Sequence, residues 1–161
     1  MMLLVSLVVL LLIGGPALAQ DLKRISLDDT LALGLQIQSD SAMKAEGKAS
    51  IKILTKWPTT VCLAEVTGPD IQNAKLVYKA RVKSDLQGTA FLEMWARVGG
   101  GQYFSRGMND PVQGKSDWKT IQTPFFFQKG QKPTRVTLNI VINGIGTVWV
   151  DDIVLSKEPL K

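Results

Sequence analysis

Three strand-like runs lie between Trp118 and Leu155: WKTIQTPFFF (118–127), TRVTLNIVI (134–142) and GTVWVDDIVL (146–155). This stretch carries the clearest indication of how the chain folds. A turn rich in Lys, Gly and Pro separates the first two runs, and glycines flank the second turn. Apolar residues occupy every second position from Val136 to Ile142, which is the period of a strand that buries one face. The stretch therefore predicts consecutive antiparallel strands.

The same two-residue period recurs upstream. Alternating segments occupy residues 50–55, 61–66, 76–83 and 90–98. Gly99-Gly100-Gly101 predicts a hairpin loop, and only residues 27–35 favour a helix, because Ser26-Leu27-Asp28-Asp29-Thr30 would cap an apolar run. Short alternating segments between turn residues are typical of antiparallel β structure rather than α/β structure. We therefore predict an all-β protein with the fold of an antiparallel β-sandwich.

The N-terminus predicts export. Met1 to Ile13 is apolar except for Ser6, and Ala17-Leu18-Ala19 has the small-x-small pattern that signal peptidase cleaves. The apolar run is shorter than the roughly 20 residues of a membrane-spanning helix. We expect a signal peptide over 1–19 and a single domain over 20–161, without stable membrane insertion after cleavage. An uncleaved N-terminal anchor is the alternative.

Composition indicates in which cellular compartment the protein acts and which partners it binds. The single cysteine, Cys62, permits no internal disulfide, and no Asn-x-Ser/Thr sequon occurs, so we expect a bacterial periplasmic or secreted protein. Cys62 lies in the apolar stretch TVCLAEV, which predicts a buried, inert thiol. The net charge of +5 comes from lysines and arginines that are scattered singly, a pattern typical of a solvated surface. We therefore expect no nucleic-acid partner.

The sequence also argues against an enzyme. It contains no histidine, which excludes Ser-His-Asp and Cys-His arrangements. Glycoside hydrolysis requires two carboxyl groups that flank the bond, and nothing in the sequence sets the separation of Glu65, Glu93 and Asp110. We therefore predict a protein without catalytic residues.

Four pieces of the chain, in their order and spacing, resemble the carbohydrate-binding jelly rolls of the galactose-binding-like superfamily. They are EGKASIKIL (46–54), LVYKARVK (76–83), the strand that begins at Trp118, and GTVWVDDIVL (146–155). The stretch FLEMWARVGGGQYFSRG (91–107) also resembles uncharacterised secreted bacterial proteins. The resemblance implies a galactose-binding-like jelly roll over about residues 46–155.

The resemblance further implies a structural calcium ion, because an Asp on the closing strand of this family often helps to hold one. Asp151 best matches that position, and several oxygen ligands would have to converge on the ion. In the alternative role, Asp151 caps backbone amides at the edge of the sandwich and Asp152 is solvated. Because neighbouring residues on a strand point to opposite faces, we expect the two carboxylates not to share one role.

A ligand face is predicted if residues 76–83 and 90–98 form a hairpin. One surface would then carry Lys79, Arg81, Phe91, Glu93, Trp95 and Arg97. Asn139 would extend this surface, and Tyr103 would line its rim. Trp95 offers a flat ring for the apolar face of a sugar, and the polar side chains offer paired hydrogen bonds. The two arginines and the lysine favour an acidic glycan, because guanidinium binds carboxylate and sulfate in bidentate fashion.

Two other interpretations of this surface remain open. Cross-strand pairs of Arg81 with Glu93 and of Lys79 with Trp95 would stabilise a sheet that binds nothing, by about 0.2–1 kcal/mol each. A partner protein or a loop would also cover an exposed Trp95. We predict non-catalytic carbohydrate binding, with a glycan as the partner. The alternative is an envelope scaffold or a protein–protein interaction module, with an envelope protein as the partner.

Overall fold

The computed structural model describes residues 19–28 and 36–160. These residues form eight strands: β1 (Gln20–Ile25), β2 (Ile37–Asp40), β3 (Ser50–Thr55), β4 (Thr59–Thr67), β5 (Ala74–Val98), β6 (Gly101–Arg106), β7 (Val112–Phe127) and β8 (Pro133–Glu158). The described part of the chain contains no helix, and hence none that is long and apolar enough to cross a membrane. Most of the helix predicted over 27–35, and the predicted signal peptide apart from Ala19, lie outside the described residues.

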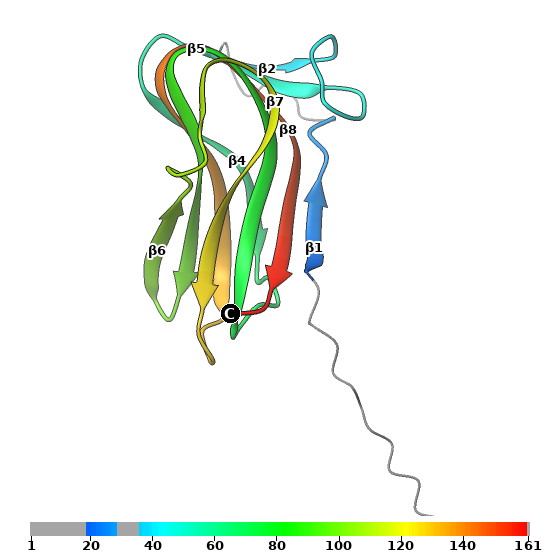
Figure 1. The fold of residues 1–161 in the computed structure, drawn as a ribbon. Helices are drawn as coiled ribbons and strands as arrows, with labels where there is room; N and C mark the ends of the chain where they lie inside the picture. The colour runs from blue at the N-terminus through cyan, green and yellow to red at the C-terminus, as the bar shows by residue number, and fades with distance from the viewer. Residues whose placement is uncertain (1–18, 29–35, 161) are drawn as a thin grey trace, which may run out of the picture.

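Two long strands organise the sandwich. β5 and β8 pair in antiparallel fashion along almost their whole lengths, from Lys75↔Glu158 to Val98↔Pro133. Both strands bend over together at one end of the molecule, at the top of Figure 1, so that each passes through both layers. The hydrogen-bonded ladder is therefore one antiparallel sheet of eight strands that is folded into two layers.

The shorter strands complete each layer. In the first layer, the order is β4, the first half of β8, the second half of β5, and β6. In the second layer, β1 and β3 both pair with the second half of β8. The second half of β8 also pairs with the first half of β5, and the first half of β5 pairs with β7. β2 extends the second layer beyond β3. This arrangement confirms the predicted antiparallel β-sandwich.

Glycines make the bend possible. Gly88 of β5 lies opposite Gly144 of β8, with φ of +143° at Gly88 and +140° at Gly146. A Cβ atom on Gly88 would lie 2.1 Å from the Asn143 carbonyl oxygen, and one on Gly144 would lie 2.4 Å from the Gln87 carbonyl oxygen. The two backbones can therefore approach this closely only without side chains.

The core lies between the layers and follows the predicted alternation. Away from the bend and the strand ends, alternate residues of the long strands are buried, including Tyr78, Ala80 and Val82 of β5 in the second layer. In the first layer the buried residues of these strands include Leu92, Met94, Leu138 and Ile140. The residues between them point outward, so each layer has one outer face.

The predicted hairpin of residues 76–83 and 90–98 is wrong. Both segments belong to the single strand β5, and they lie in different layers. Asp85, Gln87 and Gly88 resemble a turn in the sequence, but here the strand continues across the bend, paired with β8. The predicted hairpin loop at residues 99–101 is confirmed, since Gly99 and Gly100 join β5 to β6 with φ of +56° and +83°.

Candidate functional site

The outer face of the first layer gathers a set of polar and aromatic side chains, and we call it the Trp95 face. Its residues come from all four strands of the layer: Cys62, Glu65, Phe91, Glu93, Trp95, Arg97, Gln102, Phe104, Arg106, Arg135, Thr137 and Asn139. Strand alternation places them there, because each of these residues pairs across the sheet with another member of the set or lies between two core residues on its own strand.

Glu93 lies at the centre of this face. It is only 3% exposed, although its side chain leaves β5 on the side away from the core. Its Oε1 accepts hydrogen bonds from Trp95 Nε1 (2.7 Å) and Asn139 Nδ2 (3.1 Å), and its Oε2 accepts one from Arg106 Nε (2.6 Å). One carboxylate therefore joins three side chains from three strands.

These contacts set the charge state of Glu93. Burial is the largest single influence and raises its pKa, but the hydrogen bonds from Arg106, Trp95 and Asn139, with the charge of Arg106, together outweigh burial. The pKa of Glu93 therefore lies below the ordinary value of 4.5, and the carboxylate is ionised at neutral pH. A buried carboxylate whose oxygens are both engaged is well suited to positioning its neighbours.

An aromatic pair lies beside Glu93. The rings of Trp95 and Phe104 have centroids 5.0 Å apart and planes tilted by 45°. The Arg106 guanidinium lies over the Phe104 ring, 4.8 Å from its centroid. Phe104 is 53% exposed and Trp95 is partly exposed, so the pair offers apolar ring surface to solvent. The bond from Trp95 Nε1 to Glu93 holds the orientation of the indole.

Basic residues lie at the margin of the face. Arg97 of β5 is directly opposite Arg135 of β8, which places two like charges side by side. Arg135 lies 3.7 Å from Glu65, and Thr137 also donates to Glu65. Among residues 19–28 and 36–160, no carboxylate lies within ion-pair distance of Arg97. This margin therefore has one guanidinium available to an anionic group.

Four of the seven predicted ligand-binding residues come together on the Trp95 face: Glu93, Trp95, Arg97 and Asn139. Tyr103 lies on the neighbouring strand β6, but its side chain leaves on the opposite side from Phe104 and lines a hollow at the end of the sandwich. Lys79 and Arg81 lie on the outer face of the second layer, where Arg81 pairs in register with Asp151. The expected pairs of Arg81 with Glu93 and of Lys79 with Trp95 are therefore wrong.

Sequence reasoning considered Phe104 and Arg106 only as companions of Tyr103 at a rim, and did not place them opposite Trp95 and Glu93. The signal was present, because the two-residue Gly99-Gly100 loop sets a register in which Trp95 lies opposite Phe104 and Glu93 lies opposite Arg106. Cys62 was also placed wrongly: its side chain is exposed on the Trp95 face, opposite Asn139. Partial desolvation by its neighbours and the nearby Glu65 carboxylate raise the pKa of Cys62, so the thiol is not activated.

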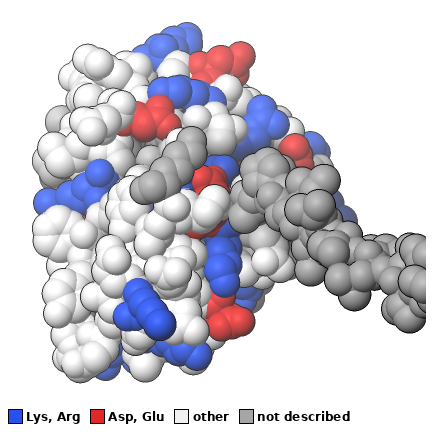
Figure 2. Space-filling model, turned by 60° about the horizontal axis from the view of Figure 1, so that its bottom comes forward, with Lys and Arg blue, Asp and Glu red and all other residues white. Residues whose placement is uncertain are grey.

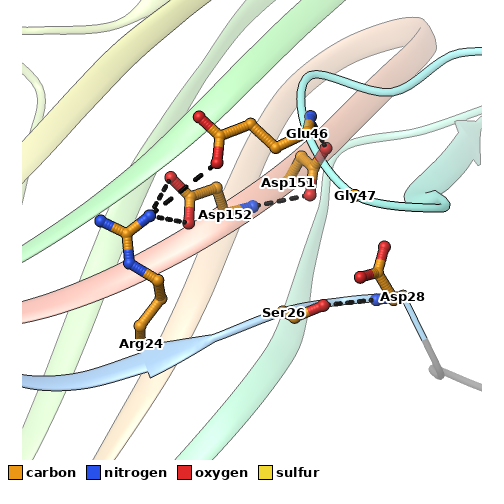
Figure 3. A pocket seen from close by; sticks show the side chains of 7 residues that line it. All are labelled: Arg24, Ser26, Asp28, Glu46, Gly47, Asp151 and Asp152. Carbon is orange, nitrogen blue, oxygen red and sulfur yellow. Dashed lines mark hydrogen bonds and ion pairs between the residues drawn. The ribbon is translucent and has the colours of Figure 1, made fainter.

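Asp151 lies in the second layer, in a hollow of about 140 Å³ between β1 and the loop before β3 (Figure 3). It is 3% exposed. Its Oδ2 accepts the backbone N–H groups of Ala45 (2.8 Å) and Glu46 (3.0 Å), and its Oδ1 accepts that of Asp152 (2.8 Å). Asp151 thus fastens the loop to β8, which is the capping role that the sequence offered as the alternative.

The expectation that Asp151 and Asp152 point to opposite faces is wrong. Asp152 has a φ of +45°, and the β5–β8 register shifts at this point, which marks a β-bulge. The bulge turns both carboxylates to the same outer face, where they line one hollow (Figure 3). Asp152 binds Arg24 Nη1 at 2.8 Å. Asp152 is therefore an ion-pair partner rather than a fully solvated residue.

The contacts around Asp151 do not fit a calcium ion. Calcium requires several converging oxygen ligands. The Asp151 carboxylate instead faces three N–H donors, Asp152 faces a guanidinium, and Asp28 accepts the N–H groups of Lys48 and Ala49. Within the described residues, no group of three or more acidic, Cys or His side chains is placed to hold a metal. Structural calcium stays a prediction from the resemblance alone.

The fold is the β-sandwich jelly roll that is also seen in carbohydrate-binding modules. The structure is similar to the CBM22-1 xylan-binding domain from Paenibacillus barcinonensis Xyn10C, with a TM-score of 0.64 and 13% identity over 92% of this chain and 100% of that one. The structure is also similar to a family 16 carbohydrate-binding module, with a TM-score of 0.56 and 10% identity over 81% of this chain and 92% of that one.

A third similar structure is larger than this chain. It contains the CBM22-1 and GH10 modules of Clostridium thermocellum endo-1,4-beta-D-xylanase 10B, with a TM-score of 0.61 and 12% identity over 88% of this chain. The match spans 29% of that chain. No protein-family model and no curated protein matches this sequence. At these identities the similarity establishes the fold, and it confirms the resemblance to carbohydrate-binding jelly rolls.

Proposed function

We propose that this protein binds a carbohydrate without catalysing a reaction, and that the Trp95 face is its binding surface. The observation that carries the proposal is the partly exposed Trp95–Phe104 pair, which is held in place by the buried Glu93 carboxylate. Oriented aromatic rings suit the apolar face of a sugar ring, and the surrounding polar side chains suit its hydroxyl groups. The similar structures, which include a xylan-binding domain and the CBM22-1 module of an endo-1,4-beta-D-xylanase, support the same class of ligand.

The chemistry of the face supports binding rather than catalysis. Both oxygens of Glu93 accept hydrogen bonds, so this carboxylate is already committed to Trp95, Asn139 and Arg106. The chain has no histidine to act as a general base. The face therefore presents surfaces and hydrogen-bonding groups, and no positioned acid and base.

The glycan that suits this face best carries acidic groups. Arg97 lies opposite Arg135, and a carboxylate between them would relieve the repulsion of the two guanidinium groups. On the face that Figure 2 shows, Lys and Arg side chains are dispersed, with uncharged area between them. We further propose that the protein acts after export to the periplasm or the medium, where such polymers occur.

The experiment is a titration of the exported chain with glucuronoxylan, which carries uronic acids, and with neutral arabinoxylan. We expect saturable binding that is tighter for glucuronoxylan and weakens with added salt. Trp95→Ala should weaken binding at least about tenfold, equivalent to about 1.4 kcal/mol. Trp57→Ala is the matched control, because Trp57 is 57% exposed and lies near the bend, away from the Trp95 face.

Cys62 offers an independent readout. It is the single cysteine, and its exposed thiol lies on the proposed surface, opposite Asn139. Bound glucuronoxylan should slow alkylation of Cys62 by a maleimide. If neither polymer binds a well-folded protein, or if Trp95→Ala binds as the wild type does, the proposal is wrong. The envelope scaffold would then be the function to test.

A further inference from the structure

A groove begins where the Trp95 face ends. Phe104 and Arg106 belong to the Trp95 face, and they also line a hollow of about 420 Å³ between the edge strands β6 and β7. The opposite wall of this hollow is formed by Pro124, Phe125 and Phe126 of β7. Ser105 joins the two edges, because its hydroxyl contacts Thr123 Oγ1 (2.8 Å) and the Pro124 carbonyl oxygen.

The groove continues towards the end of the sandwich. Phe125 and Phe126 also line a second hollow of about 220 Å³, together with Tyr103. Tyr103 then lines a third hollow, of about 470 Å³, with Gln131 and Lys132 from the β7–β8 turn. Neighbouring hollows share these aromatic residues, so the three hollows follow one another along the path from the Trp95 face to Lys132.

The lining of this path matches the chemistry of the proposed surface. Phe104, Phe126 and Tyr103 are 53%, 56% and 56% exposed, which is unusual for large apolar side chains on one edge of a small sandwich. Polar groups that can hydrogen-bond hydroxyls lie between the rings, and the path ends at the cation of Lys132. A bound chain of sugar units would pack against these aromatic rings and hydrogen-bond to the polar groups between them. The acidic groups of the chain would lie near Arg106 and Lys132.

We infer that the groove between β6 and β7 is an extension of the carbohydrate site, so that the ligand is a glycan chain that crosses the edge strand β6. This inference rests on the proposed function. A short fragment would occupy the Trp95–Phe104 pair alone, whereas a longer fragment would also contact Phe126 and Tyr103. Affinity should therefore rise with chain length, and the added affinity should depend on Phe126.

The test is a length series of acidic xylo-oligosaccharides, from disaccharide to hexasaccharide, titrated into the full chain by calorimetry. We expect the hexasaccharide to bind at least about tenfold more tightly than the disaccharide. Phe126→Ala should remove most of this gain and leave disaccharide binding unchanged. Ile145→Ala is the control, since Ile145 is 53% exposed and lies at the bend, so this variant should retain the full gain.

The outcomes separate the inference from the proposed function. If the disaccharide binds in a Trp95-dependent way and affinity does not rise with length, the groove inference fails and the proposed function stands. The inference also fails if affinity rises with length equally in the wild type and in Phe126→Ala. If no fragment binds a folded protein, the proposed function fails and the inference fails with it.

Discussion

At the scale of single residues, the arrangement of the Trp95 face depends on one buried carboxylate. Glu93 accepts hydrogen bonds from an indole, an amide and a guanidinium, none of which could bond to another in the same geometry, since all three are donors. Removing the acceptor would leave these donors facing one another. Nothing in the strand pattern indicates that an outward-facing Glu would be buried.

Glu93→Gln should therefore destabilise the fold and disorder the face. The glutamine amide replaces one acceptor by a donor and removes the charge that pairs with Arg106, which we expect to cost about 1–3 kcal/mol. Equilibrium unfolding in urea measures the loss, and near-ultraviolet circular dichroism reports the orientation of the Trp95 ring.

Glu65→Gln is the matched control on the same face. The Glu65 side chain is 50% exposed and lies 3.7 Å from Arg135, so its loss should cost no more than about 1 kcal/mol. Equal stability of the two variants would contradict the central role that we assign to Glu93.

At the scale of the elements, the fold depends on two strands that do not end where their composition suggests. The segment SDLQGT (84–89) has the polar residues and the glycine of a turn, yet β5 continues through it. β8 bends beside it, with Gly144 opposite Gly88. Gly88 and Gly144 therefore allow two backbones to approach closely. They do not reverse the direction of a strand, as glycines in a turn do.

Gly88→Ala should be among the most damaging single substitutions in the protein. Its φ of +143° is unfavourable for any other residue, and the new Cβ would overlap the Asn143 carbonyl oxygen. We expect a loss of more than about 3 kcal/mol, the upper end of the range for strain alone. Thermal and urea unfolding measure it.

Gly99→Ala is the control that distinguishes the cost of backbone strain from the cost of steric overlap. Gly99 has a φ of +56°, but no atom lies within 4 Å of the position that a Cβ atom would take, so only the strain of about 1–2 kcal/mol applies. A Gly88→Ala variant no less stable than Gly99→Ala would show that the bend tolerates a side chain.

At the scale of the whole molecule, the ionisable groups predict how stability depends on pH. The chain has no histidine, so no side chain has an ordinary pKa between about 5 and 8. Several carboxylates have lowered pKa values. Hydrogen bonds from Ser26, Ala49 and Lys48 lower the pKa of Asp28 from 3.8 to about 2, and a hydrogen bond from Lys75 is the main cause that lowers the pKa of Glu158.

The melting temperature should therefore be nearly flat from about pH 5 to 8 and fall in acid. A carboxylate with a lowered pKa contributes stability above its unfolded value, 3.8 for Asp and 4.5 for Glu, and this contribution is lost as the pH falls through the folded pKa. Scanning calorimetry from pH 2 to 8 measures the profile. A steep change between pH 6 and 8 would contradict it.

Much of the architecture could be predicted from the sequence, because strand burial is a local, periodic property. The alternation from Val136 to Ile142 predicted a buried face, and the Gly99-Gly100-Gly101 loop predicted a hairpin. The class of fold followed from the order of such segments. Four of the predicted ligand residues also share a face, since three of them alternate on one strand, β5.

Which strands lie together, and which way the irregular residues point, depends on tertiary pairing. Pairing along β5 and β8 separated Arg81 from Trp95, and a bulge at Asp152 turned two adjacent carboxylates to one side. Neither effect has a local signal, because both depend on the partner strand. Local periodicity is enough to predict antiparallel strands and the class of fold. Long-range pairing is what buries Glu93 under Trp95, Asn139 and Arg106, and so makes the Trp95 face a candidate site.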